Sequence, residues 1–331
     1  MKLLFVFTGG TIGSTRHGDV ISTDKSKSYK IIEEYEKRYG IDFEYDTEEP
    51  YTELSENNTG EQIRKLCACV KSNINKDYDG IIITHGTDTL QYTAAALGYA
   101  LGLDSIPVCL VSSNRPIEDE RANGLENLRG AVRFIEDRCG RGAFVIYRND
   151  RSDTIRAHRG TRLLGAKAYS DDVSSAGSVV YGHFLWDVFV KAMEYAEPDD
   201  EMSPIDMTSL TDMSETIQII TPYPGMIYPE ISEGVRYIIL NTYHSGTINT
   251  KSQATRDFCK KASERGITVF ASGVSGGADY ESATLYESLG IIPAKNISPV
   301  ALYIKCWALA CASMSVCDNI FRPLSGDITT E

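Results

Sequence analysis

Two short loops rich in glycine and threonine are the places where this sequence could perform chemistry. The first, Thr8–Ile12, directly follows the apolar run Leu3–Phe7, and the second, His85–Thr89, directly follows Ile81–Ile83. Short apolar runs rich in strand-forming residues predict buried parallel strands, and functional groups in open α/β sheets gather at the carboxyl ends of such strands. We therefore expect hydroxyls, backbone N–H groups and one carboxylate in a single crevice. That combination suits nucleophilic attack on a carbonyl and stabilisation of the resulting oxyanion.

Strands and helices are expected to alternate along the chain, which indicates parallel βαβ units and an α/β fold. In the N-terminal part we predict strands at Leu3–Phe7, Gly80–Thr84, Pro107–Ser112 and Ala143–Tyr147, and helices at Glu61–Ile74, Asp88–Leu101 and Ala122–Arg138. In the C-terminal part we predict strands at Ile217–Ile220, Tyr237–Leu240 and Thr268–Ala271, and helices at Ser252–Arg265 and Pro299–Ser313.

A polar, acidic segment around Glu197–Glu201 separates these two parts and is typical of an interdomain linker. We therefore predict a larger N-terminal α/β domain at residues 1–195, a linker at 196–216 and a smaller C-terminal α/β domain at 217–331. The larger domain is expected to hold a mainly parallel sheet flanked by helices. The polar segment Val20–Tyr45 follows the first glycine loop, and we interpret it either as an active-site lid or as a disordered surface loop.

The composition excludes several classes of protein. The chain has 331 residues, of which 42% are hydrophobic and 24% charged, as in an ordinary globular protein. Its net charge of −13 argues against a general nucleic-acid binder, which needs clustered lysine and arginine. No apolar stretch reaches the roughly 18 residues of a membrane span, and the N-terminus is typical of a first strand rather than of a signal peptide. We expect a cytoplasmic protein without nucleic-acid or membrane partners.

The eight cysteines are scattered, form no CxxC pair and have no histidine at zinc-finger spacing. This pattern predicts free, buried thiols in a reducing cytoplasm. Neither a metal site nor a catalytic cysteine has local support in the sequence.

Taken together, the two loops resemble those of the bacterial-type L-asparaginase and glutaminase family. The resemblance lies in Thr8–Ile12 and His85–Thr89, continues through Leu97, and extends to Pro107–Arg115 and Ala166–Val173. It implies a two-domain α/β fold, a homodimer or homotetramer with sites between subunits, and a small amino-acid substrate. Members of the family hydrolyse the side-chain amide of asparagine, and some that of glutamine, without a metal or an organic cofactor.

The resemblance also assigns catalytic roles. Thr11 matches the first nucleophile, beside the turn that Gly9 and Gly10 allow, and Thr87 matches the second catalytic threonine. Asp88 matches the carboxylate that binds the substrate amino group, although an aspartate there could also cap the following helix. Lys167 matches the catalytic lysine, and we expect it to be buried beside Thr87 with a lowered pKa.

Further positions are assigned to substrate binding. Ser55 and Glu56 resemble the turn that holds the substrate carboxylate and contacts its amino group, and Gly10 and Gly86 are expected to border the substrate. Glu281 is a candidate for the acidic residue that completes the amine pocket. The family's catalytic tyrosine has no counterpart at Gly18–Val20, so Tyr29, the nearest tyrosine downstream, is the candidate for that role.

Three functions remain open at the level of sequence. The first is an L-asparaginase that acts through a threonine nucleophile and an acyl-enzyme. The second is a glutaminase or another amidase, including a subunit that releases ammonia for transamidation of aminoacyl-tRNA; those relatives carry an extra N-terminal module, whereas this sequence starts at the first predicted strand. The third is a non-catalytic amino-acid-binding protein on the same scaffold.

Overall fold

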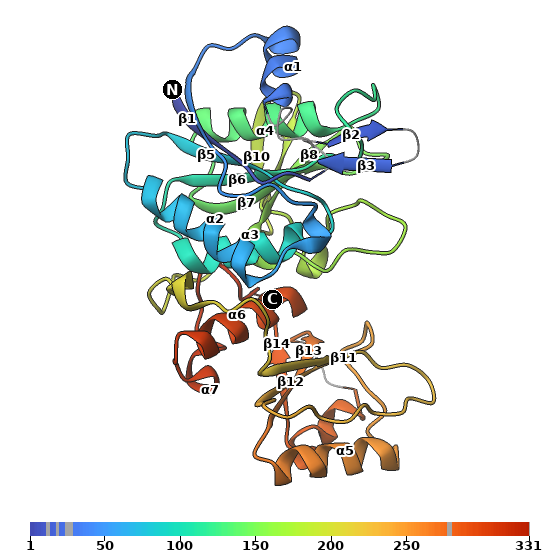
Figure 1. Ribbon diagram of the computed structural model, residues 1–331. Helices are drawn as coiled ribbons and strands as arrows, with labels where there is room; N and C mark the ends of the chain where they lie inside the picture. The colour runs from blue at the N-terminus through green and yellow to red at the C-terminus, as the bar shows by residue number, and fades with distance from the viewer. Residues whose placement is uncertain (11–13, 18–19, 24–28, 277–279, 331) are drawn as a thin grey trace.

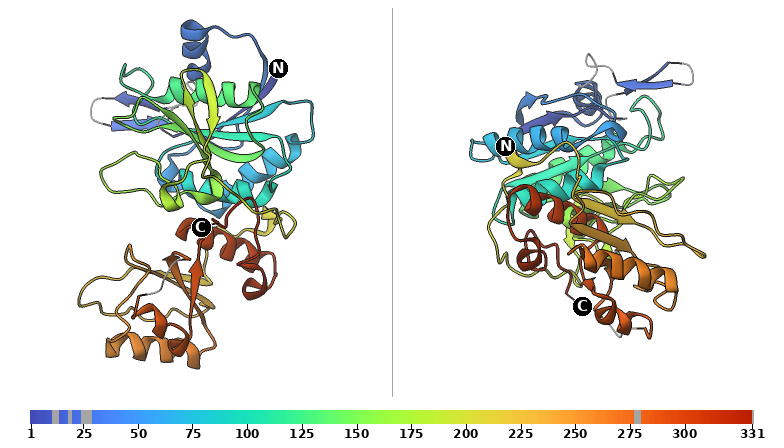
Figure 2. Two further views of the ribbon diagram at one scale, coloured as in Figure 1. Left: turned by 180° about the vertical axis from the view of Figure 1, so that it is seen from behind. Right: turned by 60° about the horizontal axis from the view of Figure 1, so that its bottom comes forward.

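The computed structural model describes residues 1–10, 29–276 and 280–330 in full, and the backbone of residues 14–17 and 20–23. Within these residues the chain forms a larger and a smaller α/β layer, one above the other, with helix α6 (Pro299–Cys311) between them (Figure 1). Views from behind and with the lower end turned forward show the same arrangement (Figure 2).

The larger sheet has the strand order β10-β9-β8-β7-β6-β5-β1-β4 among the described residues. Its parallel strands are β1 (Lys2–Phe7), β4 (Glu44–Glu48), β5 (Gly80–Thr84), β6 (Pro107–Val111) and β7 (Gly142–Arg148). Beyond β7 follow the antiparallel strands β8 (Ile155–Arg159), β9 (Gly182–Leu185) and β10 (Val188–Lys191). Because β1 and β5 are parallel neighbours, the two glycine loops leave the sheet at the same edge.

Helices cover both faces of the larger sheet. Helices α2 (Gly60–Asn73) and α3 (Leu90–Leu101) pack on one face, and α1 (Lys30–Tyr39) and α4 (Gly124–Glu136) on the other (Figure 1). Side chains alternate along a strand, so Val6 of β1 packs with α2 and α3, whereas Phe5 and Phe7 pack with α1 and α4. Burial of both faces explains the apolar run that ends at the first glycine loop.

The smaller sheet is parallel, with the order β11-β12-β13-β14. Its strands are β11 (Ile217–Ile220), β12 (Tyr237–Asn241), β13 (Thr268–Val274) and β14 (Ile291–Lys295), and α5 (Gln253–Glu264) packs against it. Helix α6 shares one apolar cluster with both layers: Leu302 and Trp307 belong to the same cluster as Leu97 of α3 and Phe270 of β13.

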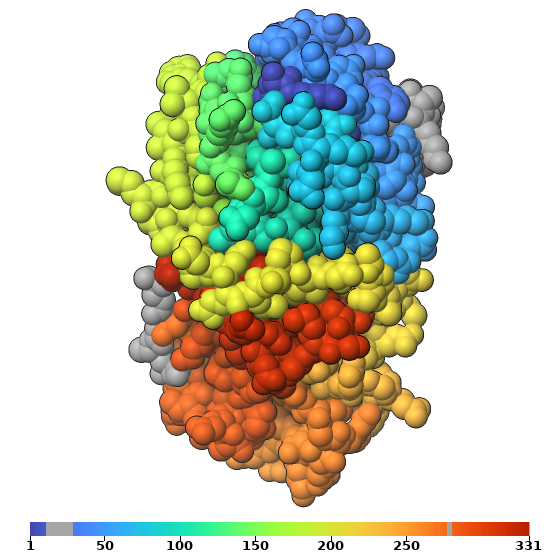
Figure 3. All heavy atoms as spheres, turned by 90° about the vertical axis from the view of Figure 1, so that its left-hand side faces the viewer, coloured from blue at the N-terminus to red at the C-terminus, as the bar shows by residue number. Residues whose placement is uncertain are grey.

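The segment after α6 and the short helix α7 (Val316–Asn319) returns to the larger layer. In the space-filling view the red residues of α6, α7 and the C-terminal segment lie together between the two layers (Figure 3). Thr161 Oγ1 donates to the Ser325 carbonyl at 2.7 Å, and Arg162 Nε donates to the Gly326 carbonyl at 2.6 Å. These hydrogen bonds attach the C-terminal segment to the chain that follows β8.

The predicted strands and helices all occur, with ends that shift by up to three residues, and the predicted α/β fold is confirmed. The sequence did not predict α1, α7, β4, β8, β9, β10, β14 or the antiparallel pair β2 (Ser14–His17) and β3 (Val20–Thr23). The alternative of a disordered surface loop at Val20–Tyr45 is therefore wrong for the described residues, which include β3, α1 and the beginning of β4. The alternative of an active-site lid stays a prediction. Short 3₁₀ turns lie at Ser55–Asn57, Gly160–Arg162, Ala176–Ser178, Met207–Ser209, Ala283–Leu285 and Glu287–Leu289.

Within the described ranges, no helix has the length and hydropathy needed to cross a membrane. All eight cysteines lie in the described part of the chain, and none of them is bridged. A search of the same residues finds no group of histidine, cysteine, aspartate and glutamate side chains arranged to hold a metal ion.

Candidate active site

The two glycine loops touch at the carboxyl edge of the larger sheet. Gly10 has φ +77°, and a Cβ on it would lie 2.4 Å from the Gly86 nitrogen, so only glycine fits this approach. The Gly10 N–H donates to the Glu53 carbonyl at 3.0 Å, which holds the first loop against the chain that leads to Ser55. Backbone from β1 and β5 is thereby brought together, as the sequence predicted.

Ser55 is hydrogen-bonded to the second glycine loop. It is 3% exposed, and its Oγ accepts a hydrogen bond from the Asp88 N–H at 3.2 Å and lies 3.3 Å from Asp88 Oδ2. Thr89 Oγ1 donates to the Ser55 carbonyl at 2.8 Å, and a Cβ on Gly86 would lie 2.5 Å from Ser55 Oγ. The Asp88 side chain thus pairs with Ser55, and helix α3 begins after Thr89 without a side-chain cap.

His85 is a structural part of the site that the sequence analysis left without a role. Its Nδ1 lies 2.8 Å from the carbonyl oxygen of Gly86. Because a carbonyl oxygen can only accept a hydrogen bond, Nδ1 carries the ring proton. Its Nε2 then accepts from Thr93 Oγ1 at 2.9 Å and lies 3.2 Å from Asn58 Nδ2. Burial lowers the pKa of His85 to about 4, which keeps the imidazole neutral. His85 therefore fixes the backbone directly before Thr87.

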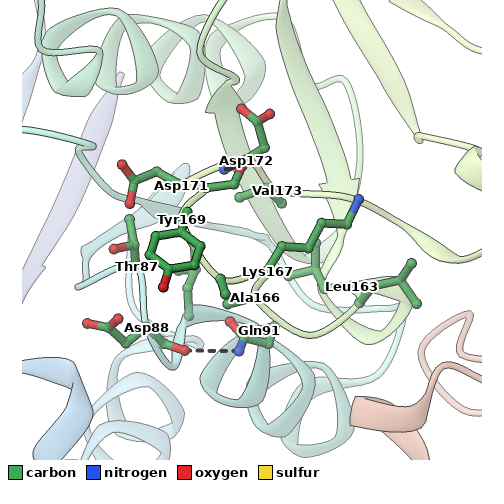
Figure 4. A pocket seen from close by; sticks show the side chains of 14 residues that line it. Thr87, Asp88, Gln91, Leu163, Ala166, Lys167, Tyr169, Asp171, Asp172 and Val173 are labelled. Atoms are coloured by element: carbon green, nitrogen blue, oxygen red, sulfur yellow. Dashed lines mark hydrogen bonds between the residues drawn. The ribbon is translucent and has the colours of Figure 1, made fainter.

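Thr87 and Asp88 form one wall of a pocket of about 500 Å³. Thr87 is half-buried and Asp88 is exposed to the pocket. In Figure 4, Gln91 Nε2 donates to the Asp88 carbonyl, at 3.0 Å, and both side chains lie at the lower edge of the site. The opposite wall is the chain from Leu163 to Val173, named here the pocket loop.

The pocket loop has a fixed base and an exposed tip. At its base, the Leu164 N–H donates to the Ser174 carbonyl at 2.9 Å, and the amide of Asn149 exchanges two hydrogen bonds of 2.9 Å with the Val173 backbone. At its tip, an added Cβ on Gly165 would meet nothing within 4 Å. The pocket loop is therefore fixed at its base by hydrogen bonds and exposed at its tip.

Lys167 lies on this tip, and the prediction that it is buried beside Thr87 is wrong. The side chain lines the pocket but is exposed, and Figure 4 shows its amine pointing away from Thr87 and Asp88. The physical reason is that no described segment packs over the tip of the loop, so nothing desolvates the amine.

Asp171 of the same loop lies on the Thr87 side of the pocket (Figure 4). Burial raises the pKa of Asp171, the charge of Asp88 raises it further, and Arg115 acts in the opposite direction. The sequence analysis did not single out Asp171, because an aspartate in a polar stretch gives no signal of its own.

The remaining predicted residues are only partly brought together. Thr11 lies outside the described residues. The ring of Tyr29 is 43% exposed and packs edge-on against Phe7 at 5.1 Å, directly before the first loop. Glu56 is exposed next to Ser55. Glu281 has an 84% exposed side chain that pairs with Lys251 at 3.2 Å, and it does not line the pocket.

The fold and the pocket define a class of α/β proteins in which two touching glycine loops frame a threonine and an aspartate. The comparison with protein families gives that class its name. A family model described as "Asparaginase, N-terminal" matches residues 2–182, more than half of the chain. The chain belongs to the asparaginase family.

The relatives that resemble this chain include both amidotransferase subunits and L-asparaginases. The chain is 24% identical over 325 residues to a glutamyl-tRNA(Gln) amidotransferase subunit of Pyrobaculum aerophilum, covering 93% of this chain and 75% of that protein. It is 27% identical over 278 residues to L-asparaginase 1 of Escherichia coli K12, covering 81% and 78%. The solved structure of the thermostable L-asparaginase from Thermococcus kodakarensis matches the fold with a TM-score of 0.79 at 22% identity, over the full length of both chains.

Proposed function

We propose that this protein is an amidohydrolase that hydrolyses the side-chain amide of L-asparagine to L-aspartate and ammonia. One observation carries the proposal: Gly10 contacts Gly86, so the loop that leads to Thr11 borders the loop that presents Thr87 and Asp88. Two threonines on adjoining loops with a carboxylate beside them suit acyl transfer without a metal or a cofactor. Similarity to L-asparaginase 1 supports the same substrate.

In the proposed reaction a threonine hydroxyl attacks the amide carbonyl, and Thr11 is assigned this attack. The carbonyl oxygen becomes an oxyanion, for which backbone N–H groups of the glycine loops are suitable donors. The proton that the threonine hydroxyl loses is transferred to the nitrogen, and the C–N bond then breaks, which releases ammonia and leaves an acyl-enzyme. Water, activated next to Thr87, then attacks the ester and releases L-aspartate and the free hydroxyl.

Substrate binding is assigned to the residues around Ser55. Ser55 and Gly10 are proposed to border the α-carboxylate, and Asp88 to bind the α-ammonium, with Glu56 at the rim. Lys167 can act as a base only if the tip of the pocket loop turns its amine toward Thr87. Glu281 does not line the described pocket, so it can contribute to substrate binding only in the pocket of another subunit. This role suits a homodimer or homotetramer with sites between subunits.

The similarity to the amidotransferase of Pyrobaculum aerophilum supports a second candidate, hydrolysis of glutamine to supply ammonia. The two candidates share the same nucleophile and differ by one methylene in the substrate, so the pocket chemistry is common to both. A cytoplasmic location is part of the proposal and is supported by the unbridged cysteines.

The test is ammonia release by the purified protein from L-asparagine, L-glutamine and their D-forms. We expect L-asparagine to be hydrolysed fastest. Glutamine hydrolysis at a higher kcat/KM would favour the second candidate, and no release from any amide would contradict the enzymatic proposal.

We predict that Thr87→Ala loses more than about a hundredfold in kcat, because residues that act as one catalytic unit give large losses. The measurement is steady-state ammonia release, with the fold checked by circular dichroism. Thr208→Ala is the matched control, since Thr208 is an exposed threonine whose hydroxyl, among the described residues, bonds Asp206 alone. Turnover within a few-fold of the wild-type rate in Thr87→Ala would remove Thr87 from the mechanism.

A further inference from the structure

We propose that Asp171 is a specificity-determining residue, and that it joins Asp88 in binding the α-ammonium group of a free amino-acid substrate. The inference rests on the proposed function, because it assigns a second acidic partner for the substrate in the same pocket. It places this partner on the pocket loop of the same chain.

The pocket loop directs Asp171 and its neighbour Asp172 to different places. In Figure 4 the Asp171 carboxylate lies on the Thr87 side of the pocket, whereas the Asp172 carboxylate points away from Thr87 and Asp88. Asp172 Oδ1 accepts the Asp150 N–H at 2.9 Å, so its carboxylate holds the base of the loop. The Asp171 side chain forms no hydrogen bond or ion pair with any residue that the structure describes. It is therefore available to a ligand.

The described residues do not neutralise the negative charge in the pocket. Neither Asp88 nor Asp171 has an ion-pair partner among the described residues, and the charge of Asp88 raises the pKa of Asp171. Lys167 is the sole cation among the described residues that line the pocket, and its amine points outward. Arg115 acts on Asp171 from outside the pocket and lies 3.9 Å from Asp119.

Asp150 and Asp172 also raise the pKa of Asp171, so the surroundings of this carboxylate are predominantly acidic. Two carboxylates that flank the hydroxyl of Thr87 in the pocket (Figure 4) favour a ligand that brings a positive charge. A primary ammonium has three N–H donors, enough for one carboxylate on each side. An amino acid whose nitrogen is part of a peptide bond lacks this charge and leaves both carboxylates unpaired. The pocket is thereby built to select free amino acids over peptide-bound ones.

The experiment compares two substrates that differ only in the amino group: L-asparagine and succinamic acid, which has the same carboxylate and amide. We expect Asp171→Asn to lower kcat/KM for L-asparagine at least about tenfold and to leave succinamic acid unchanged or improved. Asp172→Asn is the matched control on the neighbouring residue. In this variant the ratio of kcat/KM for L-asparagine to kcat/KM for succinamic acid should equal the wild-type ratio.

Three results would overturn the inference. They are an equal loss of kcat/KM for both substrates in Asp171→Asn, wild-type kcat/KM for both substrates in that variant, and a selective loss of L-asparagine activity in Glu281→Gln in place of Asp171→Asn. If the wild-type protein releases no ammonia from any amide, the proposed function fails. Binding of L-aspartate and of succinate, measured by calorimetry, then tests separately whether Asp171 binds the α-ammonium group. L-Aspartate should then bind more tightly than succinate to the wild-type protein but not to Asp171→Asn, and equal binding in the wild type would contradict the inference.

Discussion

At the scale of single residues, His85 combines a polar side chain with complete burial. Its ring is 1% exposed, and both nitrogens are used, one toward the Gly86 carbonyl and one toward Thr93. An imidazolium at this position would bring a buried charge, and Thr93 Oγ1 would have to accept from Nε2 instead of donating to it. The native hydrogen bonds of the ring therefore require its neutral form.

This requirement predicts a loss of stability in acid. In the folded state the pKa of His85 is about 4, below its ordinary value of 6.5, and burial likewise lowers the pKa of His158 to about 3. Between pH 6.5 and 4 the unfolded chain binds protons that the folded chain refuses, so the free energy of unfolding must fall as the pH falls. For His85 alone the loss is on the order of 2–3 kcal/mol.

Urea unfolding from pH 7 to pH 4 measures this loss, and we expect a shallower pH dependence in His85→Gln. His244→Gln is the control, because His244 is exposed. Titration of the wild-type imidazoles by NMR gives the same answer without a variant, and a His85 pKa near 6.5 would contradict the prediction.

The contrast between Lys167 and Ser55 shows which site residues the sequence could predict. The backbone positions of Ser55, Thr87 and Asp88 follow from their loops, because the contact of Gly86 with Ser55 and the hydrogen bonds of Ser55 with Asp88 and Thr89 fix these loops. The orientation of Lys167 depends on whether another segment covers the tip of the pocket loop, and no short motif contains that information. His85 was missed because a histidine next to a glycine is equally typical of a surface residue.

At the scale of elements, the segment between the two glycine loops is more ordered than its polarity indicates. Helix α1 buries Ile31, Ile32 and Tyr35 against the larger sheet, and Tyr29 precedes it with its ring on Phe7. Packing thus fixes Tyr29 at the end of β1, next to the residues that lead to the predicted nucleophile. Whether its hydroxyl takes part in the reaction stays a prediction.

We predict that Tyr29→Phe lowers kcat about a hundredfold, the range typical for the loss of an acid–base group. The ring contact with Phe7 is retained in this variant, so the free energy of unfolding should not change. Ammonia release and urea unfolding measured together separate the two effects, and an unchanged kcat would remove the Tyr29 hydroxyl from the mechanism.

The elements that were predicted and those that were missed differ in burial. Strands β5 and β6 are buried along their whole length, and a continuous apolar run is a strong signal for such strands. Strand β4 is mostly exposed and spans Glu44–Glu48. Strand β8 contains His158, whose Nδ1 lies 2.8 Å from Ser175 Oγ, and Arg159, which pairs with Glu197. The sequence of such a strand does not reveal the partners that make its burial possible.

At the scale of the whole molecule, one buried ion pair joins helix α6 to the C-terminal segment. Lys305 Nζ lies 2.8 Å from Asp327 Oδ2, and both side chains are completely buried. Tyr99 of α3 donates to the same carboxylate oxygen at 3.0 Å, and the Leu324 N–H donates to Oδ1 at 3.0 Å. The pair therefore holds α3, α6 and the C-terminal segment together at one point.

We predict that Asp327→Asn lowers the free energy of unfolding by about 3–5 kcal/mol, because it leaves the Lys305 charge buried without its partner. Combining it with Lys305→Met removes that charge and should restore part of the loss. Urea unfolding of the two single variants and the double variant measures the coupling. Asp318→Asn, on the exposed face of α7, serves as the control and should change stability by less than about 0.5 kcal/mol. Additive effects of the two substitutions would contradict the prediction.

The attachment of the C-terminal segment also has a consequence for how the molecule matures on the ribosome. Arg162 stands directly before the pocket loop, and its acceptor at Gly326 lies 164 positions later in the chain. Domains generally fold from the N-terminus during synthesis, and the local contacts of the pocket loop with Asn149 and Ser174 emerge together with the larger layer. The contact of Arg162 with Gly326 forms much later, so a nascent chain carries a nearly complete sheet whose chain before the pocket loop still lacks its C-terminal partner.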